Sequence, residues 1–176
     1  MSESPADRLR RLASAIAEEP VQVNGALDRV AEVGELARRL KAEPSLADAL
    51  IPLMDDPDRQ VALAAIAHAP AFDPRATARL RALAGGPPGE RRSAALHALA
   101  RRKDRAILPL ALTQLDGDDP AARAEALGWL AWLLRPDELV EAIDRRPSLG
   151  GDPAARAARV EATARAVALG FLPEDG

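Results

Sequence analysis

The chain has 176 residues and a formal net charge of -3, and 48% of its residues are hydrophobic, 29% charged and 2% aromatic. This balance excludes a disordered chain and gives no global attraction to phosphate backbones or anionic lipid. Because the chain contains no cysteine, disulfides, thiolate catalysis and cysteine-based metal sites are excluded as well.

The apolar residues favour helix. Alanine dominates, while the aromatic and β-branched residues that strands prefer are scarce. The composition therefore predicts an all-α protein.

The first 43 residues predict one helical hairpin. Apolar residues at helical spacing predict a helix over 5–18 and another over 24–40, with Asn24 as the N-cap of the second. Residues 1–11 are polar and charged, which argues against a signal peptide. The longest nearly uncharged stretch, 61–72, is too short for a membrane helix. We therefore expect a cytoplasmic protein that does not contact membranes.

Residues 44–169 contain four internal repeats. In each, a shorter helix is followed by a turn rich in Asp, Pro or Gly and then by a second helix, whose start the turn aspartates cap. The shorter helices are predicted at 46–54, 74–84, 104–115 and 136–146, and the turns at 55–58, 85–89, 116–120 and 150–153.

Three columns of residues recur in the second helices at spacings of 30, 31 and 33 residues. Offsets of five and three residues place the columns on one helical stripe, which we expect to be buried between neighbouring repeats. The columns are Val61, Arg91, Ala122 and Ala155; Ile66, Leu96, Leu127 and Val160; and Ala69, Leu99, Leu130 and Thr163.

A single hairpin cannot bury such a stripe, but stacked hairpins can. The sequence therefore predicts one domain, a right-handed α-solenoid of about five antiparallel helical hairpins. It comprises the N-terminal hairpin (1–43), four repeats (44–169) and a C-terminal tail (170–176).

The pattern Asp-Pro-x-x-x-Val/Arg-x-x-Ala-Ala, followed by Leu three residues later, resembles the HEAT repeat. The short 30-residue form is similar to HEAT-like repeats of the phycobilisome-lyase type, and Pro109 matches that family's bent first helix. The resemblance implies that turn aspartates and helix arginines form a structural ladder between repeats, here Asp119, Asp152, Arg92, Arg123 and Arg156.

The chain departs from the family pattern in the first, second and last repeats. Ala62 replaces the ladder arginine in the first repeat, Arg91 replaces an apolar residue in the second, and a Gly-Pro turn at 85–89 replaces the Asp turn. Arg159 and Thr163 stand at apolar positions of the last repeat, as in a polar terminal cap.

No pattern predicts catalysis, a metal site or a cofactor, and we expect a protein that is not an enzyme. The two histidines, His68 and His97, lack a neighbouring Glu or second His. We expect His68 to be partly buried in a helix and His97 to face an inner groove. The acidic turns are better explained by helix capping than by calcium binding, which needs a longer series of oxygen ligands.

Three further features bear on binding. Trp129 is expected to pack against neighbouring helices, whereas Trp132 either joins it in the core or faces the groove. The basic run at 101–105 is interpreted as a solvated turn rather than a phosphate site.

The function that the sequence favours is a non-catalytic adaptor that binds another protein on the concave face of the solenoid. Two alternatives remain open, a nucleic-acid-binding protein similar to HEAT-like DNA glycosylases and a bilin-lyase-like chaperone. The expected contact residues project off the buried stripe: Leu63, Ser93, His97, Glu125, Gly128, Trp132, Glu161 and Arg165.

Overall fold

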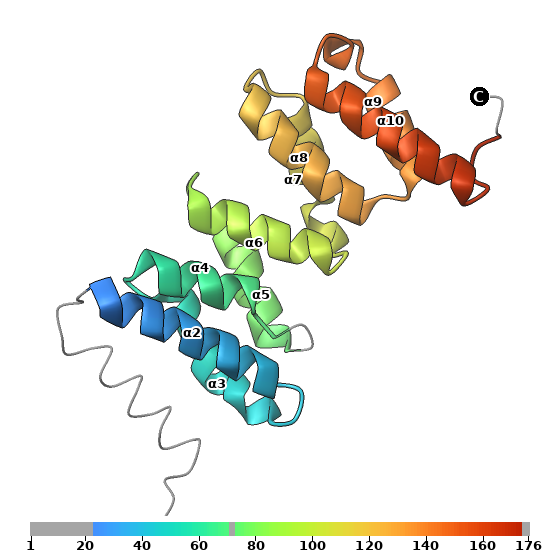
Figure 1. The fold of residues 1–176 in the computed structure, drawn as a ribbon. Helices are drawn as coiled ribbons and strands as arrows, with labels where there is room; N and C mark the ends of the chain where they lie inside the picture. Colours follow the sequence, from blue (N-terminus) through green and yellow to red (C-terminus); the bar gives the residue numbers. More distant parts are fainter. Residues whose placement is uncertain (1–22, 71–72, 174–176) are drawn as a thin grey trace, which may run out of the picture. The chain divides into compact units, whose positions relative to one another are not determined.

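A computed structural model describes residues 23–70 and 73–173, and every regular element within these ranges is a helix (Figure 1). The predicted all-α class is therefore confirmed for this part of the chain. The helix predicted over 5–18 lies outside the described residues.

The chain divides into two compact units, residues 1–98 and 99–176. The division falls within α6 (Glu90–Arg101). Each unit has its own set of packed helices and is described separately.

Unit 1 contains α2 (Val23–Arg39), η1 (Pro44–Leu46), α3 (Ala47–Leu50), η2 (Pro52–Asp55), α4 (Arg59–Ala67) and α5 (Pro74–Ala84), followed by most of α6. Helix α2 packs against α3 and α4, and α4 also packs against η2. Asn24 was expected to be an N-cap, but it lies inside α2, because the helix already includes Val23.

The single helix predicted over 46–54 is instead three short pieces, η1, α3 and η2. Pro44 and Pro52 occupy the first turns of the two 3-10 pieces. Proline lacks the N–H that would continue an α-helix, and its ring clashes with the preceding turn. The apolar periodicity of this stretch is that of a helix, but its prolines decide where the pieces begin.

Unit 2 contains η3 (Arg105–Ile107), α7 (Leu108–Leu115), α8 (Pro120–Leu133), α9 (Pro136–Asp144), η4 (Pro147–Leu149) and α10 (Pro153–Ala168). Helix α7 packs against α8, α9 packs against α10, and α8 and α10 lie side by side (Figure 1). Pro109 stands in the first turn of α7, so it begins that helix rather than bending its middle.

Aspartates cap the helices, as the turns predict. The Asp58 carboxylate accepts hydrogen bonds from the backbone N–H groups of Gln60 and Val61 at the start of α4. Asp119 and Asp152 cap α8 and α10 in the same way. A capping carboxylate satisfies N–H groups that have no partner within the helix, and it complements the positive end of the helix dipole.

Most residues of the predicted apolar columns are buried. Ile66, Leu96 and Leu127 are each at most 4% exposed, and Leu99 and Leu130 are fully buried. Val160 is the exception: it was predicted to be buried but is 68% exposed. The prediction failed because no described element packs over that side of α10.

Candidate functional site

Five of the predicted contact residues lie together in unit 2. Glu125, Gly128 and Trp132 are exposed on α8, and Glu161 and Arg165 are exposed on α10. Spacings of three and four residues keep each set on one side of its helix, and the two helices are neighbours. We call these five residues the α8–α10 surface.

The two tryptophans differ sharply in burial. Trp129 is 3% exposed, as expected, whereas Trp132 is 48% exposed, so the interpretation that both lie in the core is wrong. Trp132 is one of four large hydrophobic side chains exposed in the described part of the chain, and all four are in unit 2. The others are Val160, Leu169 and Phe171.

The side chains around Trp132 are small. Gly128 and Ala124, one and two turns before it on α8, are both exposed. A Cβ added at Gly128 would meet no atom within 4 Å. Trp132 therefore lies next to a stretch of α8 with small side chains, which a partner's backbone could approach closely.

The α8–α10 surface carries two charged side chains on α10. Glu161 and Arg165 stand four residues apart on exposed turns, a spacing at which an ion pair can form within a helix. Within residues 23–70 and 73–173, neither side chain takes part in an ion pair or hydrogen bond. Both charges are free to contact a partner.

The other three predicted contact residues belong to unit 1. Leu63 on α4 and Ser93 on α6 are half-buried, and His97 on α6 is exposed. His68 was expected to be partly buried, but it is exposed because it is the residue at which α4 ends. The α8–α10 surface contains none of these three residues.

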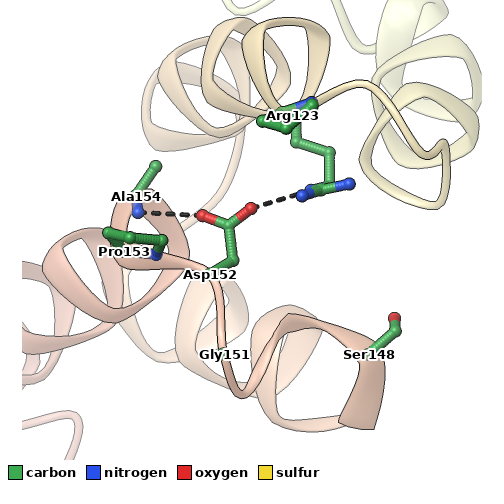
Figure 2. Close-up of a pocket in the computed structure, with 7 residues that line it drawn as sticks. Arg123, Ser148, Gly151, Asp152, Pro153 and Ala154 are labelled. Carbon is green, nitrogen blue, oxygen red and sulfur yellow. Dashed lines mark hydrogen bonds and ion pairs between the residues drawn. The ribbon is translucent and has the colours of Figure 1, made fainter.

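An ion pair links the two second helices of unit 2. The Arg123 Nε atom donates to Asp152 Oδ2 at 2.8 Å, and the two side chains are 19% and 5% exposed (Figure 2). The same carboxylate caps α10 through the N–H groups of Ala154 and Ala155. The hydrogen bond from Arg123, together with those from the backbone, lowers the pKa of Asp152 below its ordinary value.

An open hollow of about 410 Å³ lies beside this pair, lined by the starts of α8 and α10 and by Ser148 (Figure 2). Its one carboxylate, Asp152, is already bonded to Arg123 and to the helix start. The hollow is therefore a by-product of the link between repeats rather than a ligand site.

The remaining predicted ladder residues are not joined in this way. Asp119 caps α8 through the Ala121 N–H, and Arg156 is exposed on α10. Arg92 belongs to unit 1, and its Nε atom is buried without a hydrogen-bond partner among the described residues. Of the five predicted ladder residues, only Arg123 and Asp152 contact each other within one unit.

Unit 1 contains a second buried link that the sequence analysis missed. Asp56 is 4% exposed, and its Oδ2 accepts from Arg29 of α2 at 2.5 Å. Arg91 of α6 donates to the backbone oxygen of Asp56 at 2.6 Å. The turn before α4 is thus tied to both α2 and α6. The available signal was Arg91, which stands at a position where the family has an apolar residue.

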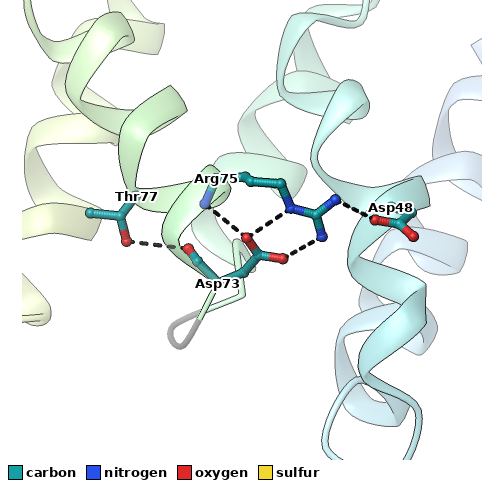
Figure 3. Close-up of polar contacts among 4 residues, drawn as sticks. All are labelled: Asp48, Asp73, Arg75 and Thr77. Atoms are coloured by element: carbon teal, nitrogen blue, oxygen red, sulfur yellow. Dashed lines mark hydrogen bonds and ion pairs between the residues drawn. The ribbon is translucent and has the colours of Figure 1, made fainter.

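Arg75 makes an exposed link between first helices (Figure 3). Its guanidinium contacts Asp73, the N-cap of α5, at 2.7 Å and Asp48 of α3 at 2.6 Å. The hydrogen bond from Arg75 lowers the pKa of the Asp73 carboxyl. This contact orients α5 against α3 but presents no unpaired group to a ligand.

The basic run at 101–105 is not a free cationic patch. Arg105 pairs with Glu138 at 3.6 Å, and Asp104 caps η3. Arg102 is half-buried, and burial lowers its pKa. Only Arg101 and Lys103 in this stretch are exposed without an ion pair to a described residue.

Metal sites and membrane-spanning helices are both absent from the described residues. No three His, Asp or Glu side chains come together there in a group that could hold a metal ion. No helix in the described ranges combines the length and apolar character needed to cross a bilayer.

The chain was also compared with known proteins. It matches no family model, no curated protein and no solved structure. The resemblance to HEAT repeats therefore depends on the residues of this chain alone.

Proposed function

We propose that the protein is a non-catalytic adaptor and that its α8–α10 surface binds a segment of another protein. The observation that carries the proposal is Trp132, a large aromatic side chain that is 48% exposed on a regular helix. Removing such a side chain from water is the kind of contact that dominates the energy of many protein interfaces.

The surroundings of Trp132 support this use. The small neighbours on α8 let a partner lie close to the helix, so that it can cover the indole ring and exclude water. Glu161 and Arg165 on the adjacent helix offer one charge of each sign, which would fix the orientation of a partner rather than supply most of the affinity.

We further propose that the units are parts of one HEAT-like solenoid. The side-by-side packing of α2 with α4 and of α8 with α10, together with the links Arg29–Asp56 and Arg123–Asp152, supports this reading. In such an array the second helices line a concave face, and Leu63, Ser93 and His97 would extend the docking surface.

The test compares variants of the full chain. Partners are captured from the native host, and the dissociation constant of a purified partner is then measured by calorimetry. Replacing a central interface tryptophan typically costs 2 kcal/mol or more, so Trp132→Ala is expected to weaken binding by roughly 30-fold. Arg165→Glu is expected to weaken it less, because it lies at the edge of the surface.

A control variant accompanies these substitutions. Arg145→Glu reverses an exposed charge at the end of α9, away from the α8–α10 surface. It is expected to leave affinity within about twofold. A partner that binds Trp132→Ala as tightly as the natural chain would rule out the α8–α10 surface.

The nucleic-acid and bilin-lyase-like alternatives stay predictions without a supporting contact. In the basic run, Arg105 pairs with Glu138 and Arg102 is half-buried, so only Arg101 and Lys103 are exposed there without an ion pair to a described residue. A nucleic-acid binder would bind duplex DNA at low salt and lose at least a decade of affinity by physiological ionic strength. A bilin-lyase-like protein would change the visible absorbance of a linear tetrapyrrole.

A further inference from the structure

Helices α8 and α10 begin with the same sequence. Each starts Pro-Ala-Ala-Arg-Ala, at 120–124 and 153–157, and each is capped by the aspartate just before it. Equivalent positions are 33 residues apart, which pairs Arg123 with Arg156 and Leu127 with Val160. In each helix the two residues are four apart and therefore lie on one side.

On α8 this side holds the next hairpin. Arg123 reaches the Asp152 carboxylate that caps α10, and Leu127, one turn along, is 4% exposed. Leu130, on the following turn, is fully buried. This side of α8 thus combines an arginine bonded to the cap of the next second helix with buried apolar residues on the following turns.

On α10 the equivalent residues have no such neighbour. Val160 is 68% exposed. The Arg156 side chain is exposed, and no acceptor among the described residues contacts its guanidinium. Thr163, in place of Leu130, donates its hydroxyl to the Arg159 backbone oxygen at 2.8 Å, so this hydroxyl needs no partner on a neighbouring helix.

We propose that Arg156, Val160 and Thr163 form a docking surface for a helical hairpin whose second helix is capped by an aspartate. Charge complementarity favours this occupant. The Arg156 guanidinium would bind the capping carboxylate, and Val160 would pack against the apolar side of the capped helix. The ion pair between Arg123 of α8 and Asp152, the cap of α10, has this arrangement in the same unit. This stripe lies on a different side of α10 from Glu161 and Arg165, so the inference does not depend on the proposed function.

The neighbouring charges agree with an acidic occupant. Arg159 is the other basic residue next to the stripe, and its guanidinium is held by Asp144 at 2.6 Å. That ion pair neutralises Arg159, whereas Arg156 makes no ion pair with a described residue.

The test supplies such a hairpin in the correct register. In the extended chain, a second copy of residues 135–176 is joined directly after Val167. Val167 is the position equivalent to Leu134, which Arg135 follows after α8 in the natural sequence. If the stripe docks the added hairpin, circular dichroism will show the added helix, and the melting temperature will rise by several degrees.

Two substitutions then test the named contacts. Arg156→Ala and Val160→Ser are expected to lower the melting temperature of the extended chain by several degrees but to leave that of the natural chain within about 1 °C. Replacing the capping aspartate of the added hairpin by asparagine should remove most of the Arg156→Ala effect, because the asparagine still caps the helix but lacks the charge.

Three results would overturn the inference. The first is that the added residues contribute no helix, and the second is that Arg156→Ala shifts the melting temperatures of both chains equally. The third is self-association of the natural chain, seen by sedimentation and lost in Val160→Asp, which would assign the stripe to a second copy of this chain instead of a hairpin.

Discussion

Two aspartates with the same capping role differ greatly in their surroundings. Asp119 is exposed and makes the cap of α8, whereas Asp152 caps α10 and also accepts the Arg123 hydrogen bond while only 5% of its side chain is exposed. Loss of an exposed cap typically costs about 1 kcal/mol. Loss of the buried Asp152 carboxylate also leaves Arg123 partly buried without its opposite charge.

We therefore expect Asp152→Ala to lower the free energy of unfolding by about 3 kcal/mol and Asp119→Ala by about 1 kcal/mol. Urea denaturation followed by circular dichroism measures both. Equal losses in the two variants would contradict a stabilising role for the Arg123–Asp152 pair.

The same pair makes stability depend on pH. Arg123 lowers the pKa of Asp152 in the folded chain, so the carboxylate binds fewer protons there than in the unfolded chain. Its contribution is fully present above the ordinary aspartate pKa of about 4 and is lost as pH falls through the lowered value. We expect the difference in unfolding free energy between the natural chain and Asp152→Asn to shrink over this range. In an Arg123→Gln background, the pH dependence of the Asp152→Asn effect should be smaller, because only the backbone hydrogen bonds to the carboxylate then lower its pKa.

At the scale of one helix, α8 carries an uncommon glycine. Gly128 is in the middle of the helix, where glycine costs about 1 kcal/mol relative to alanine, and its Cβ position is open. Gly34 in α2 is similarly open. Gly128→Ala and Gly34→Ala should each raise the free energy of unfolding by about 0.5–1 kcal/mol.

Binding separates these two substitutions. If a partner lies against α8, the added methyl of Gly128→Ala will weaken its binding, measured by calorimetry, although the chain is more stable. Gly34→Ala serves as the control and should leave affinity unchanged. Unchanged affinity in Gly128→Ala would show that no partner approaches α8 closely at this point.

Most helices could be predicted from the sequence because their signals are local. Proline in the first turn and a preceding aspartate mark the starts of α8 and α10 within a few residues of those observed. The same signals misjudged 46–54, where Pro44 and Pro52 divide an otherwise helical pattern. The site was predicted less well: Trp132 was left open, and the Arg29–Asp56 link was not foreseen.

At the scale of the whole molecule, the solenoid proposal has a hydrodynamic consequence. A compact domain of this length would have a radius of gyration of about 16 Å, whereas a stack of hairpins is longer and scatters as an elongated particle. We expect small-angle X-ray scattering to give a clearly larger radius and an asymmetric pair-distance distribution. A value near 16 Å would indicate a closed bundle instead.

The sequence by itself determined the helical class, the caps and the recurring apolar columns, because each depends on residues close together in the chain. Tertiary structure alone decided which equivalent positions are covered. Leu127 is buried and Val160 exposed although both fall in one column, and Arg123 has a carboxylate partner that Arg156 lacks. The physical reason is that burial and ion pairing depend on the presence of a neighbouring helix, and a residue's own sequence context does not contain that information.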